Sequence, residues 1–169
     1  MDYRVAVGRI NEYWLSKVLS IPIVDSVWDL ENEKVAIEVK SRCPQFTNKT
    51  FYIYEWQAFS DPGKPYYVAL MYYYVREKDI RKLGSPTEVE ENISRREVYF
   101  ADMNDIRKLP FRNWMREKEL GRIAIIKPQI ESLDLFLVED HKIKRTEKID
   151  NNKSWMAMPP ELTKLLELP

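Results

Sequence analysis

The sequence of 169 residues is poor in the residue types on which several common classes of protein depend. It contains one cysteine, so a disulfide framework within the chain is impossible and a reducing, intracellular setting is expected. It contains one histidine, which leaves little material for a histidine-based metal site or a Ser-His-Asp triad. Its four glycines form no glycine-rich phosphate loop, which argues against an enzyme driven by a nucleotide.

Long apolar runs and a net charge are also missing. The richest apolar stretch, YYVALMYYYV, is far shorter than the about 20 residues of a membrane-spanning helix. The first residues, MDYRVAVGRINEYW, carry charges and no long apolar core, so we expect no signal peptide. The 27 basic and 27 acidic residues cancel, although a local basic stripe could still bind a polyanion. We expect a cytoplasmic protein of prokaryotic, archaeal or viral origin with no membrane partner, and the abundant lysine and glutamate suggest a thermophilic source.

What the sequence does contain is enough apolar material for one packed domain over residues 1–169, since 44% of its residues are hydrophobic. Residues 2–19 place Trp14, Leu15 and other apolar side chains on one broad arc, which predicts an amphipathic helix that Pro22 ends. The apolar stretch over 66–75 predicts a buried central strand.

The remaining segments complete an α/β pattern, with a central mixed sheet flanked by helices. We expect strands over 23–30, 35–41, 96–102 and 122–127; a helix from Thr47 or Asn48 to about Ser60; a surface excursion over 76–95; a partial helix over 103–119, broken at Pro110; and a short helix within 160–168.

The first two strands form a hairpin with an unusual polar face. If its turn centres on Asn32 and Glu33, the expected pairs are Asp25 with Lys40 and Val27 with Glu38. Because side chains alternate along a strand, both members of the first pair and Glu38 then share one face, and Asp29 joins them nearer the turn. An ordinary amphipathic hairpin does not need two acids and a lysine on one face.

That face has the composition of a divalent-metal site. Mg²⁺ prefers carboxylate and carbonyl oxygens, which Asp25, Glu38 and the backbone carbonyl of Val39 could provide. Lys40 would lie near a water at the metal, where it could orient or help to deprotonate that water, or stabilise charge on a phosphate. The chemistry predicted is hydrolysis of a phosphodiester.

These residues resemble the core of the PD-(D/E)xK nuclease superfamily, which includes restriction endonucleases and archaeal Holliday-junction resolvases. The resemblance covers about residues 5–75 and implies a restriction-endonuclease-like core. It also implies that Asp25 and Glu38 are metal ligands and that Lys40 is the catalytic lysine. Glu12, in RINEYW, matches a helix-borne acid that members often add, and Gln57 matches a glutamine that faces the site in some of them.

Three features depart from the family pattern or keep alternatives open. Asp29 is a rival to Asp25 as the first ligand, and the Pro of the family motif is displaced to Pro22. A second acid-x-lysine tripeptide, Asp140 to Lys142, shows that this pattern also occurs by chance. The non-functional alternative is therefore a solvent-exposed hairpin whose Glu38 and Lys40 form surface ion pairs.

The sequence therefore predicts a Mg²⁺-dependent DNA endonuclease, with Mn²⁺ as a substitute, that acts as a restriction-type enzyme on duplex DNA. A structure-selective resolvase for branched DNA and a non-catalytic DNA-binding protein with a nuclease fold are the alternatives. Cutting both strands takes two active sites, so a homodimer is expected. Residues 76–169 are expected to serve DNA contact or dimerisation.

Overall fold

The computed structural model describes residues 2–113, 121–125 and 128–169. Its helices are α1 (Tyr3–Leu19), α2 (Glu55–Ala58), α3 (Pro86–Asn92), α4 (Met103–Arg107) and α5 (Pro160–Leu165), with 3-10 turns η1 (Ile80–Lys82) and η2 (Ile130–Ser132). Its strands are β1 (Leu30–Glu31), β2 (Ala36–Arg42), β3 (Phe51–Tyr54), β4 (Tyr66–Val75), β5 (Ile93–Asp102), β6 (Arg112–Asn113), β7 (Gly121–Ile125), β8 (Asp134–Glu139), β9 (Lys142–Thr146) and β10 (Ser154–Met158).

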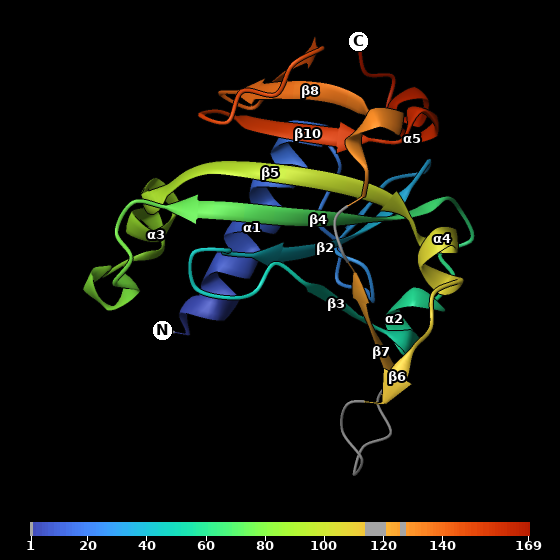
Figure 1. Cartoon of the computed structure of the whole chain (residues 1–169), viewed down its shortest axis with the longest axis horizontal. Helices are drawn as coiled ribbons and strands as arrows, with labels where there is room; N and C mark the ends of the chain where they lie inside the picture. The colour runs from blue at the N-terminus through green and yellow to red at the C-terminus, as the bar shows by residue number, and fades with distance from the viewer. Residues whose placement is uncertain (1, 114–120, 126–127) are drawn as a thin grey trace.

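Two sheets organise these strands (Figure 1). The larger sheet has seven strands in the order β1-β2-β4-β5-β10-β8-β9, and the smaller has the order β3-β7-β6. In the larger sheet β2 is parallel to β4 and β5 is parallel to β10, whereas the other neighbours are antiparallel. The predicted α/β class with a central mixed sheet is therefore confirmed.

Helix α1 covers one face of the large sheet. Trp14 and Leu15 pack there with Ile37 and Val39 of β2 in the larger of the hydrophobic cores. The helix begins where the side chain of Asp2 accepts a hydrogen bond from the backbone N–H of Arg4. The predicted helix over 2–19 is confirmed, and its apolar arc is the side that faces the sheet.

The opposite face of the large sheet is covered by the small sheet, α2 and α4. Phe51 and Ile53 of β3 and Ile125 of β7 are buried against Val68 and Leu70 of β4. The predicted central strand over 66–75 coincides with β4, which is buried on both faces over most of its length.

The predicted strand over 23–30 is wrong for most of its length. Only Leu30–Glu31 forms a strand, and Ile23 makes an isolated bridge to Leu30. The register is also shifted by two residues, because Leu30 rather than the expected Trp28 lies opposite Ile37. The turn is therefore wider than expected. The side chain of Asn32 accepts hydrogen bonds from the backbone N–H groups of Lys34 and Val35, and this widens the turn.

The predicted helix from residue 47 or 48 to about Ser60 is wrong in its first half. Phe51–Tyr54 is strand β3, and only Glu55–Ala58 is helical. The alternation of buried and half-exposed side chains along Phe51–Tyr54 is that of a strand. Its partner β7 lies about 70 residues further along the chain, so the pairing is tertiary and local sequence gives no sign of it.

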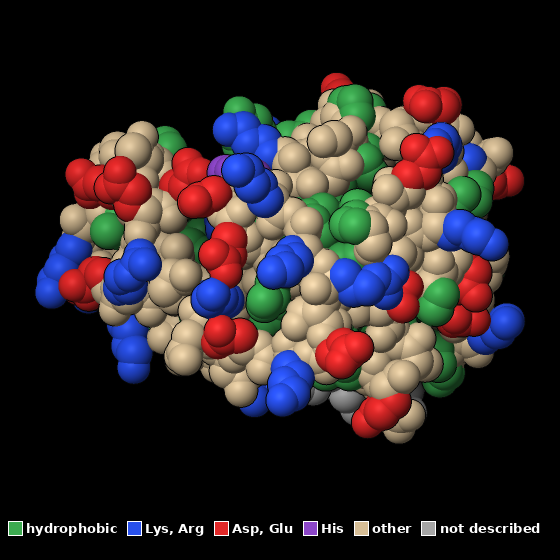
Figure 2. Space-filling view, turned by 90° about the horizontal axis from the view of Figure 1, so that it is seen from above, with side chains coloured by type: hydrophobic (Ala, Val, Ile, Leu, Met, Phe, Trp, Pro, Cys, Tyr) green, Lys and Arg blue, Asp and Glu red, His purple; other side chains and the backbone are tan. Residues whose placement is uncertain are grey.

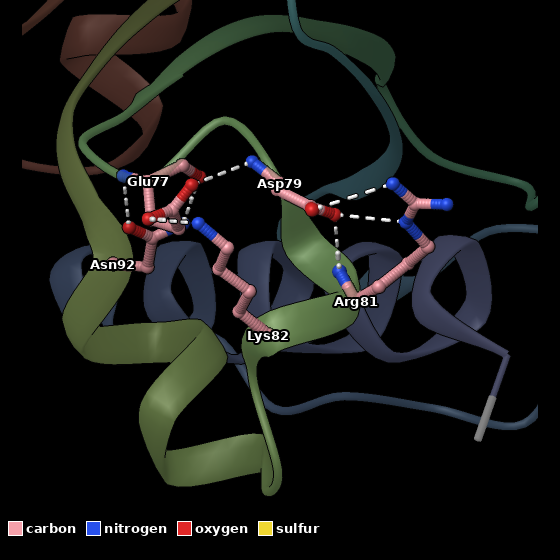
Figure 3. Close-up of polar contacts among 5 residues, drawn as sticks. All are labelled: Glu77, Asp79, Arg81, Lys82 and Asn92. Carbon is pink, nitrogen blue, oxygen red and sulfur yellow. Dashed lines mark hydrogen bonds and ion pairs between the residues drawn. The ribbon is translucent and has the colours of Figure 1, made fainter.

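The predicted surface excursion between β4 and β5 contains η1 and α3. Its polar contacts are shown in Figure 3, where Asn92 accepts from the backbone N–H of Glu77 at 2.7 Å and donates to its carbonyl at 3.0 Å. The carboxylate of Glu77 in turn accepts from the backbone N–H of Asp79 and lies 3.9 Å from the amine of Lys82. This network fixes the excursion against the start of β5.

The chain after β4 supplies β5, β10, β8 and β9, which complete the large sheet. The predicted strands over 96–102 and 122–127 correspond to β5 and β7, and the short C-terminal helix to α5. Parts of the expected helix over 103–119 and of the strand over 122–127, namely residues 114–119 and 126–127, lie outside the described residues. Asp140 and His141 form the turn between β8 and β9.

Acidic and basic side chains are mixed on the face seen in Figure 2, as the balanced composition leads one to expect. Within the described part of the chain, no helix combines the length and the apolar character that crossing a membrane requires.

Candidate active site

The site lies at an open edge of the large sheet, where β1 stops and β2 continues. The backbone N–H of Asp29 donates to the carbonyl of Ile37 at 3.0 Å, which is the last main-chain bond before the edge opens. Val39 is the next residue of β2 whose backbone faces this edge. Its N–H donates a hydrogen bond to the Asp29 carboxylate at 2.8 Å. Because the N–H and C=O of one strand residue point to the same side, the carbonyl of Val39 faces this edge too.

Glu38 is the centre of the site. It is 3% exposed, and its Oε1 lies 2.9 Å from the amine of Lys40 and accepts a hydrogen bond from the Gln57 side chain at 3.0 Å. Its second oxygen, Oε2, is buried and has no hydrogen-bond partner among the described residues. Buried carboxylate oxygens in folded proteins normally have a partner, so this oxygen indicates a missing ligand or a proton.

Gln57 reaches Glu38 from the opposite layer of the protein. Its Oε1 accepts from the backbone N–H of Tyr54 at 3.4 Å, so the amide nitrogen is left to face Glu38. The hydroxyl of Tyr66, on β4, donates to the backbone carbonyl of Gln57 at 3.3 Å. The single turn of α2 is thereby fixed to the sheet at the position of Glu38.

The carboxyl groups of the site are held in an environment that disfavours their charge. Burial raises the pKa of Glu38 to about 7, against the opposing effect of Lys40, and the nearby Asp29 raises it further. Burial also raises the pKa of Asp29, although the hydrogen bond from Val39, the charge of Lys40 and a polar contact with the Glu38 carboxyl oppose the shift. Neighbouring carboxyl groups with raised pKa values are typical of sites that bind a cation or move a proton.

Glu12 approaches the same site from α1. Burial raises its pKa to about 7 and Asp29 adds to the shift, whereas Arg9 and Lys40 lower it. Glu12 and Asp29 line an open groove of about 910 Å³ between α1 and the loop after it.

Asp25 is placed differently from the other predicted site residues. It is exposed in the loop after α1 and lines the wall of the groove that also contains Glu12 and Asp29. The corrected register explains its position, because the residue opposite Glu38 is Asp29. The structure therefore brings together Glu12, Glu38, Lys40 and Gln57 with Asp29, which the sequence offered only as a rival.

The residues present fit a hard divalent cation, although the fit is incomplete. Among residues 2–113, 121–125 and 128–169, no group of three or more His, Cys, Asp and Glu side chains is arranged to hold a metal ion. The edge nevertheless offers the carboxylates of Asp29 and Glu38 and the carbonyl of Val39, which are oxygen donors of the kind Mg²⁺ prefers. The unpartnered Oε2 of Glu38 is the group that a cation would satisfy.

Comparison of the chain with protein-family models, with curated proteins and with solved structures found no match. The site is therefore interpreted from its own geometry.

The sequence signal that could have selected Asp29 is the turn. The side chain of Asn32 accepts hydrogen bonds from the backbone N–H groups of Lys34 and Val35. Asn is common at turns because its side chain can make such bonds. A turn of that width brings Asp29 opposite Glu38 and leaves Asp25 beyond the paired part of the hairpin.

Proposed function

We propose that this protein is a metal-dependent DNA endonuclease of the PD-(D/E)xK type, with its active site at the edge of β2. The observation that carries the proposal is that the charges of Asp29 and Lys40 lie close to the buried Glu38 carboxylate. Its Oε1 contacts Lys40, and its Oε2 has no hydrogen-bond partner among the described residues. A solvent-exposed hairpin, the non-functional alternative, would leave Glu38 exposed, whereas it is 3% exposed.

Mg²⁺, or Mn²⁺ in its place, would be held by Asp29, Glu38 and the carbonyl of Val39. When bound, the cation would neutralise charge on the phosphate and make the attacking water more acidic. Its binding would also satisfy Oε2 of Glu38 and favour the ionised carboxylates, whose pKa values are raised in the metal-free protein.

The other side chains have roles that follow from their contacts. Lys40 contacts Glu38 at 2.9 Å with its amine partly open to solvent, so it can hold the attacking water or the phosphate oxygen. Gln57 orients Glu38 through its hydrogen bond. Glu12, with a pKa of about 7, can accept or return a proton near neutral pH within the groove.

The order of elements supports a restriction-endonuclease-like core. α1 carries Glu12, the β1–β2 hairpin carries Asp29, Glu38 and Lys40, and the crossover through β3 and α2 carries Gln57 before the chain enters β4. Duplex DNA cut in the manner of a restriction enzyme is the first proposed substrate. Two active sites are needed to cut both strands, so the active form would be a homodimer, and sedimentation showing only monomers on DNA would count against it.

A direct test incubates the purified protein with a supercoiled plasmid and with a synthetic four-way junction, in Mg²⁺ and in EDTA. Discrete plasmid fragments in Mg²⁺ alone support the restriction-type activity, and nicking restricted to the junction supports a resolvase. Glu38→Gln is the negative control for contaminating nuclease. Binding of DNA without cleavage in Mg²⁺ or Mn²⁺ would replace the proposal with a non-catalytic DNA-binding role.

A further inference from the structure

The outer face of the small sheet carries an unusual set of side chains. Along β3, Phe51 and Ile53 point into the core, so Tyr52 and Tyr54 point outward. Arg122 of β7 lies directly opposite Tyr54 and shares its face. Together with Arg42 and Trp56, these residues form what we term the aromatic–arginine face: Arg42, Tyr52, Tyr54, Trp56 and Arg122.

Two rings of this face are nearly parallel, and one of them, Trp56, is exposed to solvent. Tyr54 and Trp56 stack with their centroids 6.2 Å apart and an angle of 14° between their planes. The Trp56 side chain is among the most exposed large apolar groups in the described residues, at 53%. An exposed ring that adjoins other aromatic side chains, unlike a single exposed apolar residue, forms part of a contiguous patch of the kind that marks a binding surface.

The charge of the face is basic. The guanidinium groups of Arg42 and Arg122 lie over the ring of Tyr52, at 5.4 Å and 4.0 Å from its centroid. Glu55, the acid next to Trp56, is turned the other way, because its carboxylate lies over Gly121. Gly121 is adjacent to Arg122 in β7, and successive strand residues face opposite sides of the sheet. The Glu55 carboxylate therefore lies on the inner side of the small sheet, away from Arg122.

The face is joined to the candidate active site through α2. Trp56 precedes Gln57, whose side chain donates to Glu38 at 3.0 Å. Successive residues of a helix point about 100° apart, so one turn of helix presents Gln57 to the catalytic carboxylate and Trp56 to the solvent beside it. Trp56 is therefore linked to the candidate site through its neighbour Gln57.

We infer that the aromatic–arginine face binds single-stranded DNA by stacking unpaired bases on Trp56 and Tyr54, with Arg42 and Arg122 attracting the adjoining phosphates. Parallel aromatic rings interleaved with arginines are the combination used for sequence-tolerant binding of single strands. Bases inside a duplex are stacked on one another and offer no free ring face. The consequence of this binding rests on the proposed nuclease function. If the protein is a nuclease, the face would bring DNA that contains an unpaired segment to the active site.

A second copy of the chain is a less suitable occupant of this face. In a two-fold symmetric dimer the same patch meets itself, so the arginines of one copy would face those of the other. Like charges brought together at an interface are costly, whereas a phosphate backbone complements them.

The test measures binding of fluorescein-labelled dT₂₀ and of a 20-base-pair duplex by anisotropy in EDTA, where cleavage does not occur. The unmodified protein should bind dT₂₀ more tightly than the duplex. Trp56→Ala should weaken dT₂₀ binding about tenfold, and Trp56→Phe, which keeps a ring, should restore most of it. Phe46→Ala is the matched control, since Phe46 is 49% exposed and lies outside this face.

The outcomes separate this inference from the proposed function. Weakened dT₂₀ binding by Trp56→Ala supports the binding face even if the protein cleaves no DNA, in which case only the nuclease proposal fails. Equal dT₂₀ affinity of the unmodified protein, Trp56→Ala and Phe46→Ala would overturn the inference. A Trp56-dependent dimer in sedimentation, with no Trp56-dependent binding of dT₂₀, would also overturn it and assign the face to self-association.

Discussion

The amide of Gln57 donates a 3.0 Å hydrogen bond to Oε1 of Glu38, and this bond ties the layer of α2 and the small sheet to the middle of β2. The same oxygen contacts Lys40, so the buried carboxylate is oriented from two sides while Oε2 stays unpartnered among the described residues. The arrangement holds one oxygen in place and leaves the other for a ligand.

Removing this hydrogen bond should weaken function more than stability. Gln57→Ala is expected to lower the affinity for Mn²⁺, measured by calorimetry, and the rate of DNA cleavage by about 10- to 100-fold, as loss of a supporting partner of a metal ligand usually does. Gln45→Ala is the matched control, because Gln45 also makes two hydrogen bonds, to the backbone of Val75, but lies away from the site. Equal effects of the two substitutions would contradict an orienting role for Gln57.

The metal-free protein should lose stability as the pH rises through the titration of Glu38. The pKa of Glu38 is about 7 in the fold against 4.5 in the reference state, so the folded state holds a proton that the unfolded chain releases between these values. This contribution is fully present below pH 4.5 and lost as the pH passes 7. It amounts to roughly 3 kcal/mol at most.

Glu38→Gln should therefore stabilise the metal-free protein at pH 8 while abolishing cleavage. Urea unfolding in EDTA at pH 5 and pH 8 measures the effect, and the variant should show a smaller fall between the two. The matched control is Glu97→Gln, which removes a buried carboxylate that pairs with Arg95 at 2.6 Å and should destabilise instead. Destabilisation of similar size by both substitutions would contradict the raised pKa of Glu38.

A second buried polar pair anchors the helix that carries Glu12. The Nε of Arg96 donates to the side chain of Asn11 at 2.9 Å, and its guanidinium lies 4.7 Å from the ring centre of Trp14. Burial lowers the pKa of Arg96 to about 10, which leaves it charged at neutral pH. Asn11→Ala should cost about 2–3 kcal/mol of unfolding free energy, because it leaves the buried guanidinium with fewer partners.

A double-mutant cycle tests this pair. Arg96→Met combined with Asn11→Leu should be less destabilising than the sum of the two single changes, with a coupling of about 1–2 kcal/mol by chemical unfolding. Strict additivity of the two changes would show that the hydrogen bond contributes nothing to anchoring α1.

Much of the site was predictable from the sequence because its signals are local. The amphipathic pattern of α1 places Glu12 at the rim of its apolar arc, and the alternation along β2 puts Glu38 and Lys40 on one face whatever the register. Shifting the pairing of β1 with β2 by two residues leaves each side chain on the same face of the sheet. The wrong register therefore still put Glu38 and Lys40 on the correct face, and it misassigned only the aspartate opposite them.

The strand β3, which was not predicted, depends on a distant pairing. The strand Phe51–Tyr54 forms because β7, far along the chain, pairs with it, and its short apolar run suited a helix equally well. The aromatic–arginine face depends on that pairing, because Arg122 reaches Tyr52 only when the small sheet assembles.

The most direct measurement compares DNA cleavage by the unmodified protein, Asp29→Asn and Asp25→Asn in Mg²⁺, on a plasmid and on a substrate with a single-stranded segment. Both aspartates line the groove, but only Asp29 contacts the edge of β2. The account predicts metal-dependent cleavage that Asp29→Asn reduces on the order of a hundredfold or more and that Asp25→Asn leaves nearly unchanged. Wild-type rates in Asp29→Asn, or no cleavage by the unmodified protein with Mg²⁺ or Mn²⁺, would contradict it.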